Sequence, residues 1–170
     1  MTRNARLTLT ALPLLVAASS GPMAQTQVTR PPSRSIWDGV YTDAQARRGE
    51  ELYAKHCSRC HGADLAGLPW EALGQAMPEA LRSYLHFDRT PELTGPTFYA
   101  NYDRLPLSDL VERIRISMPT GKPGILSRKD TVDVVAYLLV FGGFPLGRTE
   151  LSDRLEELRE ITIVAYRPVG

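Results

Sequence analysis

The sequence predicts an all-α domain between residues 41 and 146, built from three main helices. Helical apolar periodicity with capping residues recurs three times, and no segment of this range alternates apolar and polar residues as a half-buried strand does. A third observation is the motif KHCSRCHG at residues 55–62, which holds both cysteines of the chain. The predicted domain therefore presents Cys57, Cys60 and His61 within five consecutive positions.

The first 24 residues are typical of a secretory signal peptide. Arg3 and Arg6 precede an apolar run that ends at Ala18, and small residues follow this run. The run is shorter than the roughly 20 residues that a membrane span needs. We therefore expect residues 1–24 to be removed on export, a periplasmic mature chain without a membrane span, and an N-terminal arm over residues 25–40.

The first main helix is predicted to follow Thr42. Thr42 and Gln45 have the spacing of a capping box, in which the hydroxyl and the side-chain amide each bond a backbone amide left unpaired by the helix. The helix should continue through Gly49 and Tyr53 to about Lys55. It therefore leads directly into the cysteine motif.

The second main helix is predicted to begin at Ser108 as its N-cap. It should carry charged residues on one face and apolar residues on the other. The charged face comprises Glu112, Arg113 and Arg115, and the apolar face comprises Leu107, Leu110, Val111 and Ile114.

The third main helix is the clearest in the sequence. Ser127 and Asp130 form a capping box, and Gly142 and Gly143 end the helix. A C-terminal tail over residues 147–170 follows, with a short helix capped by Ser152. The third helix has one apolar stripe, made of Val132, Val135, Ala136, Leu139 and Val140. Gly49 and Tyr53 on the first helix and Ala136 and Tyr137 on the third suit a close helix crossing.

The charge balance argues against a nucleic-acid partner. The chain has 20 Lys and Arg against 19 Asp and Glu, a formal net charge of +1. There is therefore no basic excess that would attract a phosphate backbone.

Three kinds of chemistry use two cysteines three positions apart with a histidine directly after them: a reversible disulfide, half of a zinc site, and covalent attachment of a c-type haem. A thioredoxin-like disulfide lies in a βαβ setting, whereas these cysteines follow a helix and no strand is predicted beside them. A structural zinc ion needs a second pair of ligands, which His56 and His86 do not form. The pattern favours haem attachment.

Three stretches, GVYTDAQARRGEELYAKHCSRCHGADLAG, LSDLVERIRISMPTGKPG and DVVAYLLVFGGFP, resemble a class I cytochrome c. They are most similar to the periplasmic monohaem c-type cytochromes associated with quinoprotein dehydrogenases, over about residues 36–147. The resemblance implies a cytochrome c fold, with three main helices, short helices and long loops around one covalent haem c. It also implies thioether bonds from Cys57 and Cys60, with His61 as the proximal and Met118 as the distal iron ligand.

The same resemblance implies an electron-transfer protein rather than an enzyme. It would carry single electrons between redox partner proteins, from a periplasmic dehydrogenase such as a quinoprotein (PQQ) dehydrogenase toward an oxidase or another cytochrome. The alternative is a haem enzyme or a gas-binding protein with an open distal site.

Met118 has two rivals as the distal ligand. It lies four residues after Ile114 on one helical face, so it also suits an ordinary core position, and it precedes Pro119, where the helix should end. Met77 also precedes a proline, and His86 would give a pair of histidine ligands. Chain length excludes neither rival.

The sequence departs from the family pattern in an insertion of about residues 68–90. We match the family proline whose carbonyl orients the proximal histidine to Pro91, with Pro69 as the alternative. Tyr102 matches an aromatic that contacts a haem propionate, or is an ordinary packed tyrosine. The insertion should contain a helix that either covers one side of the haem pocket or forms part of a docking surface; its apolar stripe is Trp70, Leu73, Met77 and Leu81.

Overall fold

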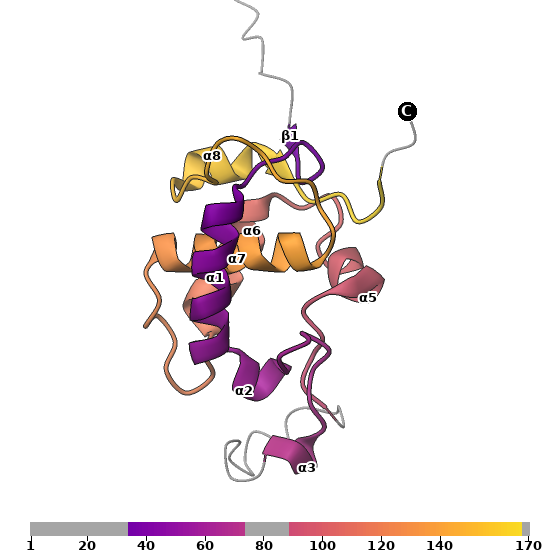
Figure 1. Cartoon of the computed structure of the whole chain (residues 1–170), viewed down its shortest axis with the longest axis vertical. Coiled ribbons are helices and arrows are strands. Elements are labelled where there is room, and N and C mark those ends of the chain that lie inside the picture. The colour runs from indigo at the N-terminus through magenta and orange to yellow at the C-terminus, as the bar shows by residue number, and fades with distance from the viewer. Residues whose placement is uncertain (1–33, 74–88, 168–170) are drawn as a thin grey trace, which may run out of the picture. The chain divides into compact units, whose positions relative to one another are not determined.

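The computed structural model describes residues 34–73 and 89–167, which fold into helices and one minimal sheet (Figure 1). The two strands β1 (Arg34–Ser35) and β2 (Ile161–Thr162) pair in parallel. No helix within these ranges is long and apolar enough to cross a membrane. The all-α prediction is confirmed by the described helices, which are α1 (Asp43–His56), α2 (Ser58–His61), α3 (Trp70–Leu73), α5 (Gly95–Ala100), α6 (Leu107–Ser117), α7 (Arg128–Phe141) and α8 (Leu155–Arg159).

The crossing of α1 and α7 is the largest contact between described helices. Gly49 lies where a Cβ atom would overlap the backbone carbonyl of Asp133, so only glycine allows the two helices to approach this closely. Next to this point the rings of Tyr53 and Tyr137 pack in a tilted arrangement, with centroids 5.2 Å apart. The predicted close crossing is confirmed.

The start of α1 differs from a full capping box. The Thr42 hydroxyl accepts a hydrogen bond from the Gln45 amide nitrogen at 3.2 Å, as predicted. The Gln45 side chain, however, bonds both backbone groups of Leu151, donating to its carbonyl at 2.9 Å and accepting from its amide at 2.7 Å. Gln45 is 1% exposed, and this pairing satisfies its buried amide while it ties the C-terminal tail to α1.

Two of the other predicted caps are wrong. Pro106, not Ser108, is the N-cap of α6, because the extended Pro106 is followed at once by helical Leu107; Ser108 is buried in the first turn. Arg154, not Ser152, precedes α8, and the Ser152 hydroxyl accepts from the Arg154 amide instead. The capping box of Ser127 with Asp130 is confirmed, as is the end of α7 at Gly142.

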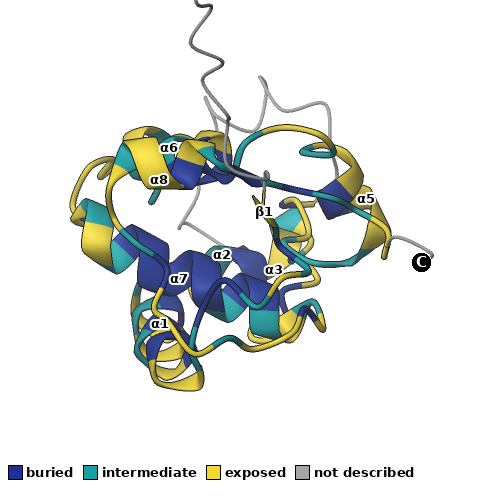
Figure 2. Ribbon diagram, turned by 90° about the horizontal axis from the view of Figure 1, so that it is seen from above, coloured by how far each residue is buried: buried dark blue, intermediate teal, exposed yellow. Residues whose placement is uncertain are grey.

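One apolar core joins the helices to both flanking segments. Most of α7 is buried (Figure 2). Ile36 from the N-terminal arm and Leu158, Ile161 and Ile163 from the C-terminal tail lie in the same cluster as the helix residues, each at most 5% exposed. The arm and the tail therefore contribute directly to the core that supports α1, α6 and α7.

Candidate functional site

A cavity of about 320 Å³ lies between the cysteine motif, the segment 90–93, and helices α5, α6 and α7. Its walls are mainly apolar, with Phe98, Leu110 and Leu138 among them. All four residues singled out in the sequence, Cys57, Cys60, His61 and Met118, line this cavity. The fold thus brings two motifs nearly 60 positions apart to one place.

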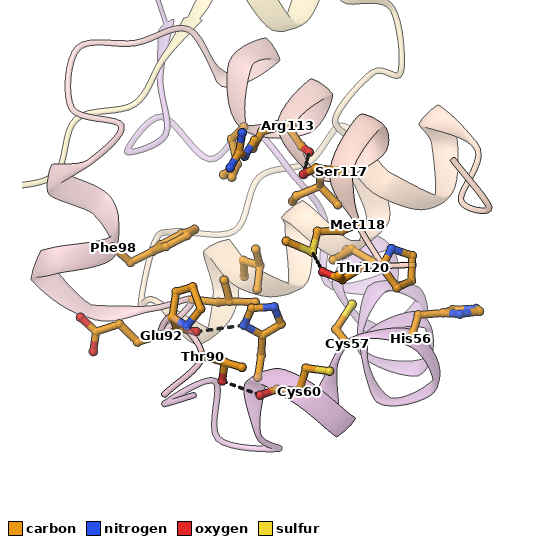
Figure 3. A pocket seen from close by; sticks show the side chains of 18 of the residues that line it. His56, Cys57, Cys60, Thr90, Glu92, Phe98, Arg113, Ser117, Met118 and Thr120 are labelled. Atoms are coloured by element: carbon orange, nitrogen blue, oxygen red, sulfur yellow. Dashed lines mark hydrogen bonds between the residues drawn. The ribbon is translucent and has the colours of Figure 1, made fainter. Parts of the chain in front are cut away.

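The cysteine motif forms a tight helical turn directly after α1. The amides of Cys60 and His61 both donate to the carbonyl oxygen of Cys57, at 3.0 and 2.9 Å. This turn directs the sulfur atoms of Cys57 and Cys60 toward the cavity (Figure 3). A second anchor is the Tyr53 hydroxyl, which donates to the carbonyl of Gly62 at 2.7 Å and so fixes the far end of the turn to α1.

The two cysteines are free thiols. Burial, with the neighbouring Cys60 in addition, raises the pKa of Cys57 to about 11, so the thiol stays protonated at neutral pH. A redox dithiol of the thioredoxin kind has the opposite property, a lowered pKa that exposes a thiolate. Within the described ranges no group of three or more His, Cys, Asp or Glu side chains is arranged to hold a metal ion. Neither the interpretation as a redox dithiol nor the interpretation as a zinc site gains support from these observations.

His61 is held in one orientation by Pro91. Its Nδ1 atom lies 2.9 Å from the Pro91 carbonyl oxygen, which can only accept, so Nδ1 carries the proton and donates. Burial is the main influence on the imidazole and lowers the pKa of His61, while the Pro91 hydrogen bond opposes this shift. The ring is therefore neutral, with Nε2 free of its proton and able to bind a metal. The match of Pro91 to the orienting proline is confirmed over Pro69.

Met118 enters the cavity from the end of α6. It is the C-cap residue of that helix, and its amide donates to Ile114 at 2.8 Å. The side chain lines the cavity, and its sulfur accepts a weak hydrogen bond from the Thr120 hydroxyl at 3.7 Å (Figure 3). The rivals Met77 and His86 lie outside the described residues.

Three polar side chains line the cavity on the side of α5 and α6: Asn101, Tyr102 and Arg113. The Tyr102 ring packs on Phe98 at 5.4 Å, and burial raises the pKa of its hydroxyl, while the nearby Arg113 opposes the shift. Arg113 was predicted on the charged face opposite the apolar stripe; it is exposed, as predicted, and it also lines the cavity. It forms no ion pair with any residue of the described ranges.

Sequence reasoning missed Thr90, Asn101 and the role of Arg113. Thr90 is 3% exposed, and its hydroxyl contacts the backbone of the cysteine motif. A single threonine before a proline carries no periodic or spacing signal, so only the fold could reveal this contact. Arg113 could have been found, because it precedes Ile114 and lies three residues after Leu110 on the predicted apolar face.

Comparison with known families gives one match. Residues 44–138 match the family model described as "Cytochrome C oxidase, cbb3-type, subunit III". The matched range begins in α1, contains the cysteine motif and Met118, and ends in α7. No curated protein and no solved structure matches the chain.

Proposed function

Because the chain belongs to the family of the cbb3-type subunit III cytochrome c domain, and is a class I c-type cytochrome, we propose that it is an exported monohaem electron carrier. Membership of this family indicates haem-based electron transfer. The observation that carries the proposal is the convergence of Cys57, Cys60, His61 and Met118 on one cavity. The chain has only these two cysteines, which supports attachment of one haem.

The residues around the cavity fit a haem c. Two thiols from one helical turn are suited to bind one porphyrin edge covalently, and the apolar walls are suited to its flat faces. His61 offers an unprotonated Nε2 as the proximal ligand, and Met118 offers a thioether as the distal ligand. When bound, the haem supplies an iron that accepts and releases one electron between its ferric and ferrous states.

The chain's own residues set the properties of such a site. The Pro91 carbonyl raises the basicity of His61 by accepting a hydrogen bond from its Nδ1–H group. A methionine opposite a histidine raises the reduction potential, since the soft thioether favours ferrous iron. With both His61 and Met118 holding the iron, no ligand position would be left open for a substrate, which favours electron transfer over catalysis.

Arg113 and Tyr102 are suited to bind the haem propionates. Tyr102 was matched to such a role by family resemblance, and its hydroxyl makes no hydrogen bond to any described residue. The Arg113 guanidinium brings a positive charge to the same part of the cavity wall. A cation and a hydroxyl donor together are the groups that buried carboxylates require.

The cellular setting of the proposal comes from the sequence. The signal-like residues 1–24 support a periplasmic protein, which agrees with the need for an export-linked haem attachment. The resemblance to cytochromes associated with quinoprotein dehydrogenases supports a PQQ dehydrogenase as the electron donor and an oxidase or another cytochrome as the acceptor. Cys57, Cys60, His61 and Met118 would hold the haem that carries one electron at a time from such a donor to such an acceptor.

Visible spectroscopy with carbon monoxide tests this function. The full chain, expressed in a periplasm with haem maturation, should change its visible spectrum on reduction. Carbon monoxide should alter the reduced spectrum little at neutral pH, since Met118 fills the distal position. Immediate binding of carbon monoxide would favour the alternative, a haem enzyme or gas-binding protein. A purified chain without a visible chromophore would contradict both.

A further inference from the structure

We propose that Thr90 is a positioning residue for His61: its hydroxyl holds the Pro91 carbonyl in hydrogen-bonding reach of the imidazole. This role rests on the proposed function, because it affects chemistry only if His61 binds the haem iron. Thr90 does not itself bind the iron; it acts through Pro91.

The Thr90 hydroxyl makes two strong contacts in a buried setting. It donates to the carbonyl oxygen of Cys60 at 2.6 Å (Figure 3) and accepts from the amide of Leu68 at 2.8 Å. The side chain is 3% exposed, so water does not compete for these partners. Both hydrogen-bonding functions of the hydroxyl are thus used.

The hydrogen bond from Thr90 to Cys60 joins the two residues that precede His61 and Pro91 in the chain. Cys60 immediately precedes His61, and Thr90 immediately precedes Pro91. Because the peptide unit is planar and stiff, fixing the Cys60 carbonyl against Thr90 limits how far the following residues can separate. The hydrogen bond from Thr90 to Cys60 and the one from His61 to Pro91 therefore act as two adjacent links between the same two segments.

Backbone hydrogen bonds alone do not supply the first link. The Thr90 amide donates to the Leu68 carbonyl at 2.9 Å, and the Leu93 amide donates to the Leu65 carbonyl at 2.8 Å. Gly67 lets these segments approach, since a Cβ there would overlap the Thr90 carbonyl. These bonds all reach the loop after the histidine. Among the described residues, two hydrogen bonds connect residues 89–93 to the turn of residues 57–61: the one from the His61 ring to Pro91 and the one from the Thr90 hydroxyl to Cys60.

Loss of the hydroxyl should weaken the hydrogen bond from His61 to Pro91. A weaker bond leaves the imidazole less basic, so it donates less electron density to the iron and stabilises the ferric state less. The reduction potential should rise. The exchange of the His61 Nδ1 proton with solvent should also become faster, because its acceptor is held less firmly.

The test compares the full-length haem proteins of wild type, Thr90→Val, Thr90→Ser and Thr131→Val. Thr131→Val is the matched control, since Thr131 is 0% exposed and donates to the Ser127 carbonyl at 2.8 Å, but does not line the cavity. Reduction potential, Nδ1 proton exchange by NMR and thermal unfolding are measured for each protein. Thr90→Val should show a raised potential and faster exchange, Thr90→Ser should match wild type in both, and Thr131→Val should lose stability without a change in potential.

The outcomes separate this role from the proposed function. A wild-type chain that matures without covalent haem overturns the proposed function and this inference with it. A wild-type haem protein whose potential and exchange are unchanged by Thr90→Val overturns the inference alone, as does an equal shift in Thr131→Val. If Thr90→Val yields no haem protein, Thr90→Ser decides: a wild-type potential supports the hydroxyl, and a shifted potential overturns its role.

Discussion

His61 and Met118 are held at the cavity by different local interactions. His61 is fixed by a hydrogen bond from its own ring to Pro91, which selects its tautomer. Met118 is fixed by its place as the C-cap of α6, where the chain turns from helix to loop. Thioether sulfur is a weak acceptor, so the 3.7 Å contact from Thr120 leaves the Met118 sulfur available to a metal.

Substitution of Met118 tests its assignment at the scale of one residue. Met118→Ala should remove the weak sulfur-to-iron absorption near the red end of the ferric spectrum and should let carbon monoxide bind the reduced protein at neutral pH. Met77→Ala is the chemically matched control and should leave both properties unchanged. Loss of the absorption in Met77→Ala, or in His86→Ala, instead of in Met118→Ala would show that the distal ligand is assigned wrongly.

The crossing of α1 and α7 is the element on which the site is built. The cysteine turn follows α1 without a break, and Val134 and Leu138 of α7 form part of the cavity wall. Gly49 sets the distance between the two helices. An ion pair reinforces the crossing, since Arg48 donates to the buried Asp133 carboxylate at 2.8 and 3.1 Å.

Gly49→Ala should destabilise the protein although alanine is the better helix former. Helix propensity alone would add about 1 kcal/mol to the free energy of unfolding. The new Cβ would overlap the Asp133 carbonyl, however, and overpacking against backbone that cannot move aside costs about 3 kcal/mol. Chemical denaturation followed by circular dichroism should therefore show a net loss of about 2 kcal/mol.

Ala44→Ser, on the exposed side of the same helix, is the control for Gly49→Ala and should change the free energy of unfolding by less than about 0.5 kcal/mol. A Gly49→Ala protein as stable as wild type would show that the helices are not in contact at this point.

At the scale of the whole molecule, segments far apart in the chain hold the end of α7. The Tyr41 hydroxyl donates to the Phe144 carbonyl at 2.7 Å, and the Tyr99 hydroxyl donates to the Leu138 carbonyl at 2.8 Å. Burial raises the pKa of Tyr41 to about 12 and raises that of Tyr99 as well. Both tyrosines therefore remain protonated in the folded protein at a pH where they would ionise in the unfolded chain.

Stability should consequently fall in alkali. The Tyr41 hydroxyl ionises near pH 10 when unfolded and near pH 12 when folded, so its contribution is complete below pH 10 and is lost as the pH rises toward 12. The loss from this group is about 3 kcal/mol, because each unit of pKa difference corresponds to about 1.4 kcal/mol. Denaturant unfolding at a series of pH values should show a shallower decline for Tyr41→Phe than for wild type.

Tyr166→Phe is the control for the alkaline decline, since Tyr166 is 68% exposed, and it should follow the wild-type curve. Identical pH dependence in wild type and Tyr41→Phe would show that the Tyr41 hydroxyl is not buried as described.

The parts of the structure that were predicted correctly depend on signals close together in the sequence. Caps and apolar periodicity located α1 and α7, and the spacing CSRCH located the cysteine turn. Gln45 was misread because its partner Leu151 lies 106 residues away, and local rules favoured a capping box instead. Thr90 was missed for the same reason, since its partner Cys60 lies 30 residues earlier. Contacts between residues that are far apart in the sequence form only when the chain folds, so no local sequence pattern predicts them.

Mass spectrometry of the denatured chain tests most directly whether the cavity is a haem c site. The protein is expressed with a haem-maturation system, unfolded and weighed, beside a chain with Cys57→Ser and Cys60→Ser. The wild-type chain should retain the mass of one haem on the peptide that contains Cys57 and Cys60, because thioether bonds survive unfolding, and the substituted chain should retain none. A wild-type chain without this added mass would contradict the haem c assignment.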